Sequence, residues 1–161
     1  MVADDVFAAD VTGENAIAHP GFPQVRLWPQ AIKRLNGERD KLPRHLLAEK
    51  RAYSATRGFS TEPLPVRCLY VLAEGSHAQI DDVKPQAALV ELIRHTYTAR
   101  LLDASRSLCH FLQCSKLAAK VPVRRLTSQR SPAALSSLAT LVEKDVAVTT
   151  LVEHDVDHAS V

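Results

Sequence analysis

The side chains whose types and spacing could do chemistry are few in this sequence of 161 residues. An acidic pair, Asp4-Asp5, interrupts an N-terminal segment, residues 2–12, that otherwise resembles a strand. Taken alone, such a pair is more often a solvated strand end than a catalytic group. It is nevertheless the best functional candidate that the sequence offers.

Histidines and cysteines form a second set of candidates. His110 and Cys114 are four apart in a predicted helix and share one face, whereas Cys109 points away from Cys114. Ligands on two faces of one helix do not converge on a metal ion. His154 and His158 also have ligand spacing, but they lie in a tail that we expect to be frayed. We therefore predict structural thiols and no metal site.

The composition is that of an ordinary globular protein, with a formal net charge of +2 at pH 7. This near-neutral charge disfavours a nucleic-acid partner or an anionic membrane surface. Arg124, Arg125 and Arg130 form a small basic cluster, which we interpret as a solvated edge in preference to a phosphate-binding patch.

Three scattered cysteines do not make a disulfide framework, and no apolar run has the length of a membrane span. Acidic residues stand where a signal peptide would need positive charge. These features predict a cytoplasmic protein with no membrane partner.

Residues 65–126 contain the strongest structural pattern. Strands at 66–72 and 77–83 flank a turn and predict a hairpin, and a helix follows from Pro85. A second helix should turn Leu108, Phe111 and Leu112 inward. A short strand at 121–126 closes the stretch, and Pro122 suggests an edge position for it. The fold class is therefore α/β, with hairpin strands followed by a helical pair and a closing strand.

The flanking segments predict further elements. Residues 2–12 and 15–19 read as a hairpin, 24–28 as a strand and 29–36 as a helix. The stretch 38–65 should be mostly loop, with one helical piece at 46–53. Ser131-Pro132 begins a final helix. We place the core at 1–130, the C-terminal helix at 131–145 and the frayed tail at 146–161.

Several segments, taken in order, carry a resemblance to a known family. They are Val2-Ala3-Asp4-Asp5-Val6, Pro20-Gly21-Phe22-Pro23-Gln24-Val25-Arg26-Leu27-Trp28-Pro29, Glu49-Lys50-Arg51, Pro63-Leu64-Pro65, Leu69-Tyr70-Val71-Leu72, Glu91-Leu92-Ile93-Arg94-His95-Thr96-Tyr97, His110-Phe111-x-x-Cys114 and Val121-Pro122-Val123-x-x-Leu126. Their order and spacing resemble the C-terminal half of the HPr-kinase-like serine kinases, over about residues 2–145. These bacterial P-loop proteins are related to HPr kinase/phosphorylase, and their core is similar to that of phosphoenolpyruvate carboxykinase.

The resemblance implies an incomplete P-loop-kinase-like core. Complete relatives use ATP and Mg²⁺ and carry a P-loop, Gly-x-x-Gly-x-Gly-Lys-Ser/Thr, upstream of the Ala-Asp-Asp strand. None of the five glycines here lies in such a run. By the resemblance, one carboxylate of Asp4-Asp5 acts as base toward the accepting serine hydroxyl, and the pair lies near Mg²⁺ and the γ-phosphate.

Two functions of different classes follow. The first is a serine kinase homologue, acting on a protein or peptide, that is inactive as given because the P-loop is absent and no cofactor is held. The second is a non-enzymatic remnant that binds a partner, either a chain supplying the P-loop half or a second copy by self-association. A weaker third, a nucleic-acid-binding helical pair at 86–120, conflicts with the near-neutral charge.

Overall fold

The computed structural model describes residues 1–28, 51–55, 58–97 and 104–158 of the chain. In this part the protein is mixed α/β, with small sheets and three α-helices. The chain divides into two compact units. Unit 1 comprises Met1–Asp10 and Ile17–Pro65, and unit 2 comprises Val11–Ala16 and Val66–Val161.

Unit 1 contains two small antiparallel sheets. The strands of the first are β1 (Ala8–Asp10), β2 (Ile17–His19) and β5 (Leu64–Pro65), in the order β1-β2-β5. In the second, β3 (Gln24–Leu27) pairs with β4 (Arg51–Ser54). The expected N-terminal hairpin is confirmed for β1 and β2, and the strand expected at 24–28 is present as β3. Residues 2–7, expected to belong to the first strand, form no strand. The helical piece expected at 46–53 is wrong at its C-terminal end, because residues 51–53 pair with β3. The helix expected at 29–36 lies outside the described residues.

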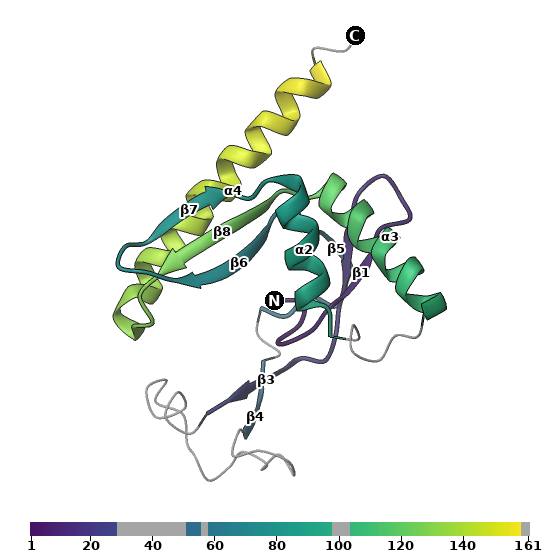
Figure 1. Cartoon of the computed structure of the whole chain (residues 1–161). Coiled ribbons are helices and arrows are strands. Elements are labelled where there is room, and N and C mark those ends of the chain that lie inside the picture. Colours follow the sequence, from purple (N-terminus) through teal and green to yellow (C-terminus); the bar gives the residue numbers. More distant parts are fainter. Residues whose placement is uncertain (29–50, 56–57, 98–103, 159–161) are drawn as a thin grey trace. The chain divides into compact units, whose positions relative to one another are not determined.

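Unit 2 is built on a three-stranded sheet. Its strands are β6 (Leu69–Glu74), β7 (Gln79–Asp82) and β8 (Val123–Ser128), in the order β6-β8-β7 (Figure 1). The central strand β8 runs parallel to β6 and antiparallel to β7. The hairpin expected between 66–72 and 77–83 is therefore wrong. Val123 and Leu126 of β8 face opposite sides of the sheet and both are buried, which a central strand achieves more easily than an edge strand.

Pro122 does not mark an edge strand. It immediately precedes β8, so its missing N–H removes no hydrogen bond from the ladder. Its carbonyl still contributes, because the backbone N–H of Leu69 donates to it at 3.0 Å. The expectation of an edge position for this strand is corrected accordingly.

Three helices complete unit 2. They are α2 (Pro85–His95), which begins with its proline at the first position, α3 (Ala104–Lys120) and α4 (Leu135–His158). The inward face expected for α3 is wrong, because Leu108, Phe111 and Leu112 are exposed and Cys114 is buried instead. The C-terminal end sets this rotation, since Leu117 packs against the core cluster that contains Val121.

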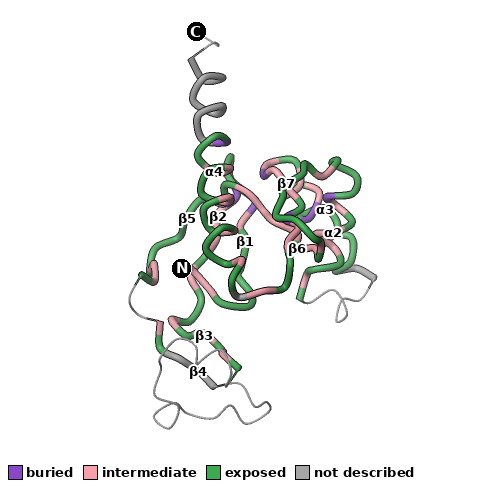
Figure 2. The backbone as a smooth tube through the Cα atoms, turned by 90° about the vertical axis from the view of Figure 1, so that its left-hand side faces the viewer, coloured by how far each residue is buried: buried purple, intermediate pink, exposed green. Residues whose placement is uncertain are grey.

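The core of unit 2 is small. Buried Val11, Ala16 and Val121 form its centre, and Leu69 and Leu117 pack against it. The ammonium group of Lys120 donates a hydrogen bond to the carbonyl of Val11 at 2.8 Å, which fixes the loop 11–16 against the end of α3. Figure 2 shows how few of the described positions are buried. Such a small apolar core leaves much of the positioning to polar contacts.

The C-terminal region begins as expected. The hydroxyl of Ser131 accepts from the backbone N–H of Ala133 at 3.3 Å, and a short 3₁₀ turn, η3 (Pro132–Ala134), leads into α4. The boundary drawn from the sequence at 130 lies between β8 and η3, whereas the boundary at 145 falls inside α4, which continues to His158. Among the described residues, none of the helices is long and apolar enough to cross a membrane.

Gly75 provides a test of this sheet arrangement. A β-carbon on Gly75 would lie well inside contact distance of the Thr127 methyl group in β8. We expect Gly75→Ala to lower the free energy of unfolding by about 1–3 kcal/mol, as overpacking does. Chemical denaturation measures this change.

The control and the rescue are both available in the chain. A β-carbon on Gly13 meets no atom within 4 Å, so Gly13→Ala should be neutral. Thr127→Ser removes the obstructing methyl group and should restore stability to Gly75→Ala. Equal effects of Gly75→Ala and Gly13→Ala would contradict the close approach of Gly75 to β8.

Candidate functional site

The acidic pair lies on an irregular segment at the N-terminus of unit 1. Both Asp4 and Asp5 are exposed. The Asp4 carboxylate accepts a hydrogen bond from the backbone N–H of Arg26, with 2.7 Å between Oδ2 and N. The backbone N–H of Gly21 donates to the carbonyl of Val2 at 2.9 Å. The N-terminal segment therefore lies against the loop that precedes β3 and against β3 itself.

The approach of these two segments is close. A β-carbon on Gly21 would meet that of Ala3 at 3.4 Å, the near limit of ordinary contact. The backbone bond to Arg26 orients the Asp4 carboxylate without removing it from solvent. Chemically, the pair offers one oriented and one further exposed carboxylate, which can accept a proton or bind a cation.

A second cluster, which the sequence did not reveal, ties the sheet of unit 2 to α4. The Arg124 guanidinium contacts the Asp145 carboxylate at 2.5 Å, the Thr149 hydroxyl at 2.8 Å and the Asp82 carboxylate at 3.1 Å. The Tyr70 hydroxyl donates to the same Asp145 oxygen at 2.5 Å. We call these five residues the Arg124 cluster. They join β6, β7 and β8 to α4.

The register of the sheet explains why these side chains meet. Tyr70 and Asp82 both stand opposite Arg124, one on each neighbouring strand, so all three project from the same face. Asp145 and Thr149 are four apart on α4 and share its inner side. The one signal available in the sequence was that Asp145 and Thr149, four apart, interrupt the apolar stripe of the last helix. Their partner on the sheet, Arg124, could not be identified without the strand register.

Electrostatics stabilise the charged state of the Arg124 cluster. Burial alone would raise the pKa of Asp145, but hydrogen bonds from Tyr70 and Arg124 outweigh burial and lower it. Burial alone would lower the pKa of Arg124, but the hydrogen bonds to Asp145 and Asp82 outweigh burial and raise it. Burial and the bond to Asp145 raise the pKa of Tyr70. The cluster therefore stores no proton for transfer near neutral pH and acts as a structural connection.

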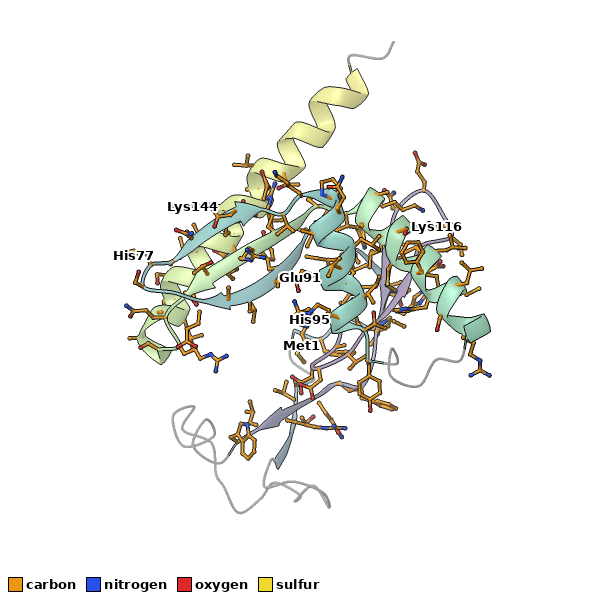
Figure 3. The ribbon with its side chains drawn as sticks, viewed as in Figure 1. Met1, His77, Glu91, His95, Lys116 and Lys144 are labelled. Atoms are coloured by element: carbon orange, nitrogen blue, oxygen red, sulfur yellow. The ribbon has the colours of Figure 1, made fainter. Side chains whose placement is uncertain are left out.

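The opposite face of β8 carries a separate ion-pair group. Glu91 of α2 lies 3.8 Å from Arg125 and 3.7 Å from each of Arg94 and His95. Glu91 and His95 are labelled on α2 in Figure 3. Arg130, the third member of the basic cluster in the sequence, pairs with Glu74 at 3.3 Å.

The expected solvated basic edge is thus not present as a single patch. Arg124 and Arg125 project from opposite faces of β8, and each of the three arginines contacts a different carboxylate. Only Arg130 is strongly exposed, since the side chain of Arg124 retains 17% of its exposure and that of Arg125 retains 47%.

The histidine and cysteine candidates are brought together only in part. His110 Nε2 lies 3.5 Å from Cys114 Sγ, which also lies 3.9 Å from the Thr96 hydroxyl. Cys109 is exposed and apart from this contact. Burial raises the pKa of both Cys114 and Cys68, so both remain neutral thiols. In the described part of the chain, no group of three or more potential ligands could hold a metal ion.

Comparison with protein families, curated proteins and solved structures finds no match to this chain.

The Arg124 cluster can be tested by mutation. Arg124→Ala leaves the part-buried Asp145 carboxylate without its cation, and we expect a loss of about 1–3 kcal/mol in the free energy of unfolding. Tyr70→Phe removes one hydrogen bond and should cost about 1 kcal/mol. Urea denaturation measures both. Arg130→Ala is the matched control, because the Arg130 pair is exposed. Similar losses for Arg124→Ala and Arg130→Ala would contradict the central role of Arg124.

The same cluster predicts how stability depends on pH. The lowered pKa of Asp145 contributes stability that is present above its ordinary pKa and is lost as the pH falls below about 4. The raised pKa of Tyr70 contributes stability that is present below about pH 10 and is lost at higher pH.

Thermal unfolding from pH 3 to pH 11 should therefore show losses at both ends. Asp145→Asn should reduce the fall in melting temperature at acid pH. Tyr70→Phe should reduce the fall in melting temperature at alkaline pH. Unchanged falls in both variants would show that other groups control the pH dependence.

Proposed function

We propose that this chain is a homologue of the HPr-kinase-like serine kinases, contributing the acidic pair of a phosphoryl-transfer site while lacking the ATP-binding loop. The observation that carries the proposal is the contact between two of the resembling segments. The segment Val2–Val6 and the segment Pro20–Pro29 are far apart in sequence, yet the Asp4 carboxylate accepts from Arg26 and Gly21 donates to Val2. A site built from both segments requires this contact.

The exposure of the pair also suits the assigned role. In phosphoryl transfer the accepting hydroxyl must reach a carboxylate that orients it in line with the phosphate. Asp4 is held by a backbone N–H while still exposed, so a serine of a protein or peptide could approach it. Asp5, exposed beside it, would hold Mg²⁺ together with the phosphates of ATP.

The remaining requirement is a cradle for the triphosphate. Backbone N–H groups of a glycine-rich loop followed by lysine normally supply it. These 161 residues contain no Gly-x-x-Gly-x-Gly-Lys-Ser/Thr run. The three arginines of the basic cluster, Arg124, Arg125 and Arg130, do not replace it, because each already contacts a carboxylate. A chain of these 161 residues should therefore be inactive alone.

The first test is ATP binding. We expect isothermal titration of the chain with Mg-ATP to give no measurable binding, because nothing in the sequence provides the cradle. Micromolar affinity would mean that the triphosphate is held in a way that the P-loop argument does not foresee.

The second test assigns the acidic pair. The P-loop segment of a complete relative, joined ahead of Val2, should restore transfer of phosphate from ATP to serine. In that chimera Asp4→Asn should lower the transfer rate by about 10²–10⁴-fold, as expected for a positioned acid–base group. Its effect on stability should be small, since Asp4 is exposed. Glu14→Gln, an exposed acid in a turn, is the matched control. Full activity of the Asp4→Asn chimera would refute the role of Asp4.

A second candidate function is a non-enzymatic module that binds a partner next to the acidic pair. Val6 and Phe7 favour it, since they are 52% and 39% exposed immediately after Asp5. Sedimentation velocity over a wide concentration range distinguishes the candidates. Self-association that Val6→Ser/Phe7→Ser abolishes supports a binding surface. A monomer at every concentration would remove the self-associating form of the second candidate, and failure of the chimera assay would remove the first.

A further inference from the structure

Helix α3 has two faces with different roles. Its inner face carries His110, Cys114 and Leu117, which are partly or fully buried within unit 2. Its outer face carries Leu108, Phe111 and Leu112, whose side chains are 64%, 46% and 50% exposed. The three outer residues are spaced three and four apart, so they form one continuous row along the helix. We call this set the α3 outer row.

The row continues into small residues. Ser115 and Ala119 follow on the same stripe at the next two turns. Large side chains at one end and small ones at the other let a neighbouring helix interlock with the first part and approach the backbone closely at the second. This is the shape of a helix-packing surface, and in the described part of unit 2 the row remains exposed.

Charge indicates which kind of helix would fit. The sequence of α3 contains no aspartate or glutamate. Lys116, labelled in Figure 3, is exposed one turn after Leu112 and flanks the row. Lys120 is held by the carbonyls of Val11 and Gly13, so its charge is directed toward that loop. The surface beside the row is therefore positive with no carboxylate of α3 to balance it.

We propose that the α3 outer row binds an acidic amphipathic helix of a partner protein, with its apolar stripe on Leu108, Phe111 and Leu112 and a carboxylate on Lys116. A second copy of the chain fits less well, because its own α3 would bring no carboxylate to Lys116. A bilayer also fits less well. Helices that lie on membranes carry many cations around their apolar face, and this row has one flanking lysine.

The binding experiment uses the whole chain and two synthetic helices. One peptide carries leucines at i, i+3, i+4 and i+7 with glutamates elsewhere, and the other carries lysines in place of those glutamates. Fluorescence anisotropy should show at least tenfold tighter binding of the glutamate peptide. Phe111→Ala/Leu112→Ala should weaken that binding at least tenfold. Val90→Ala, an exposed apolar residue of α2, is the matched control and should change nothing.

Charge reversal and thiol protection provide two further readouts. Lys116→Glu should weaken binding of the glutamate peptide and strengthen binding of the lysine peptide. Cys109 is exposed beside Leu112, whereas Cys114 is buried. The glutamate peptide should therefore slow alkylation of Cys109 and leave the slow reaction of Cys114 unchanged. All the substituted side chains are exposed, and circular dichroism confirms that the variants keep their fold.

Four outcomes would overturn the proposal. Equal affinity for the two peptides, or wild-type affinity in Phe111→Ala/Leu112→Ala, would show that the row does not recognise an acidic helix. A concentration-dependent dimer that the same double variant abolishes would assign the row to a second copy. Co-sedimentation with phosphatidylglycerol vesicles, without binding of the glutamate peptide, would assign it to a lipid surface.

Discussion

The ion pair between Arg124 and Asp145 is the interaction on which unit 2 depends. Arg124 lies in the central strand β8, and its guanidinium contacts β7 through Asp82 and α4 through Asp145 and Thr149. Removing a guanidinium from water is costly unless every strong acceptor around it has the right geometry. The position of α4 along the sheet is therefore constrained by the geometry of one side chain. The Tyr70 hydroxyl extends the same constraint to β6.

Because side chains alternate along a strand, the neighbouring residue Arg125 projects from the opposite face of β8. Arg125 projects toward α2 and pairs with Glu91 there, so two adjacent arginines each contact a different helix. This arrangement suits a unit whose buried apolar centre is small, with Val11, Ala16 and Val121 at its core. In such a unit the apolar contacts favour compactness, while charge pairs fix which helix covers which face of the sheet.

Local pattern was enough to predict most elements of the fold, but pairing was not. The strands near 69–74 and 123–128 and the helix from Pro85 follow from β-branched runs, a proline start and helical spacing. The order β6-β8-β7 is a property of the whole sheet, and a turn that could close a hairpin does not reveal that β8 lies between its strands. The rotation of α3 was missed for a similar reason. Its most apolar face is the exposed one, and contacts of Leu117 in the core set the rotation.

The two candidate sites differ in how far sequence could predict them. Asp4-Asp5 could be singled out because carboxylates are chemically conspicuous and the surrounding segments resemble a kinase family, whereas the Arg124 cluster gathers its members from four elements and needs the register. The structure then separates their chemistry. Phosphoryl transfer requires cations free to neutralise phosphate. Arg124, Arg125 and Arg130 already contact carboxylates, so these three charges form ion pairs within unit 2. These three guanidinium groups are therefore engaged within unit 2, and phosphate chemistry at the exposed acidic pair would need other cations.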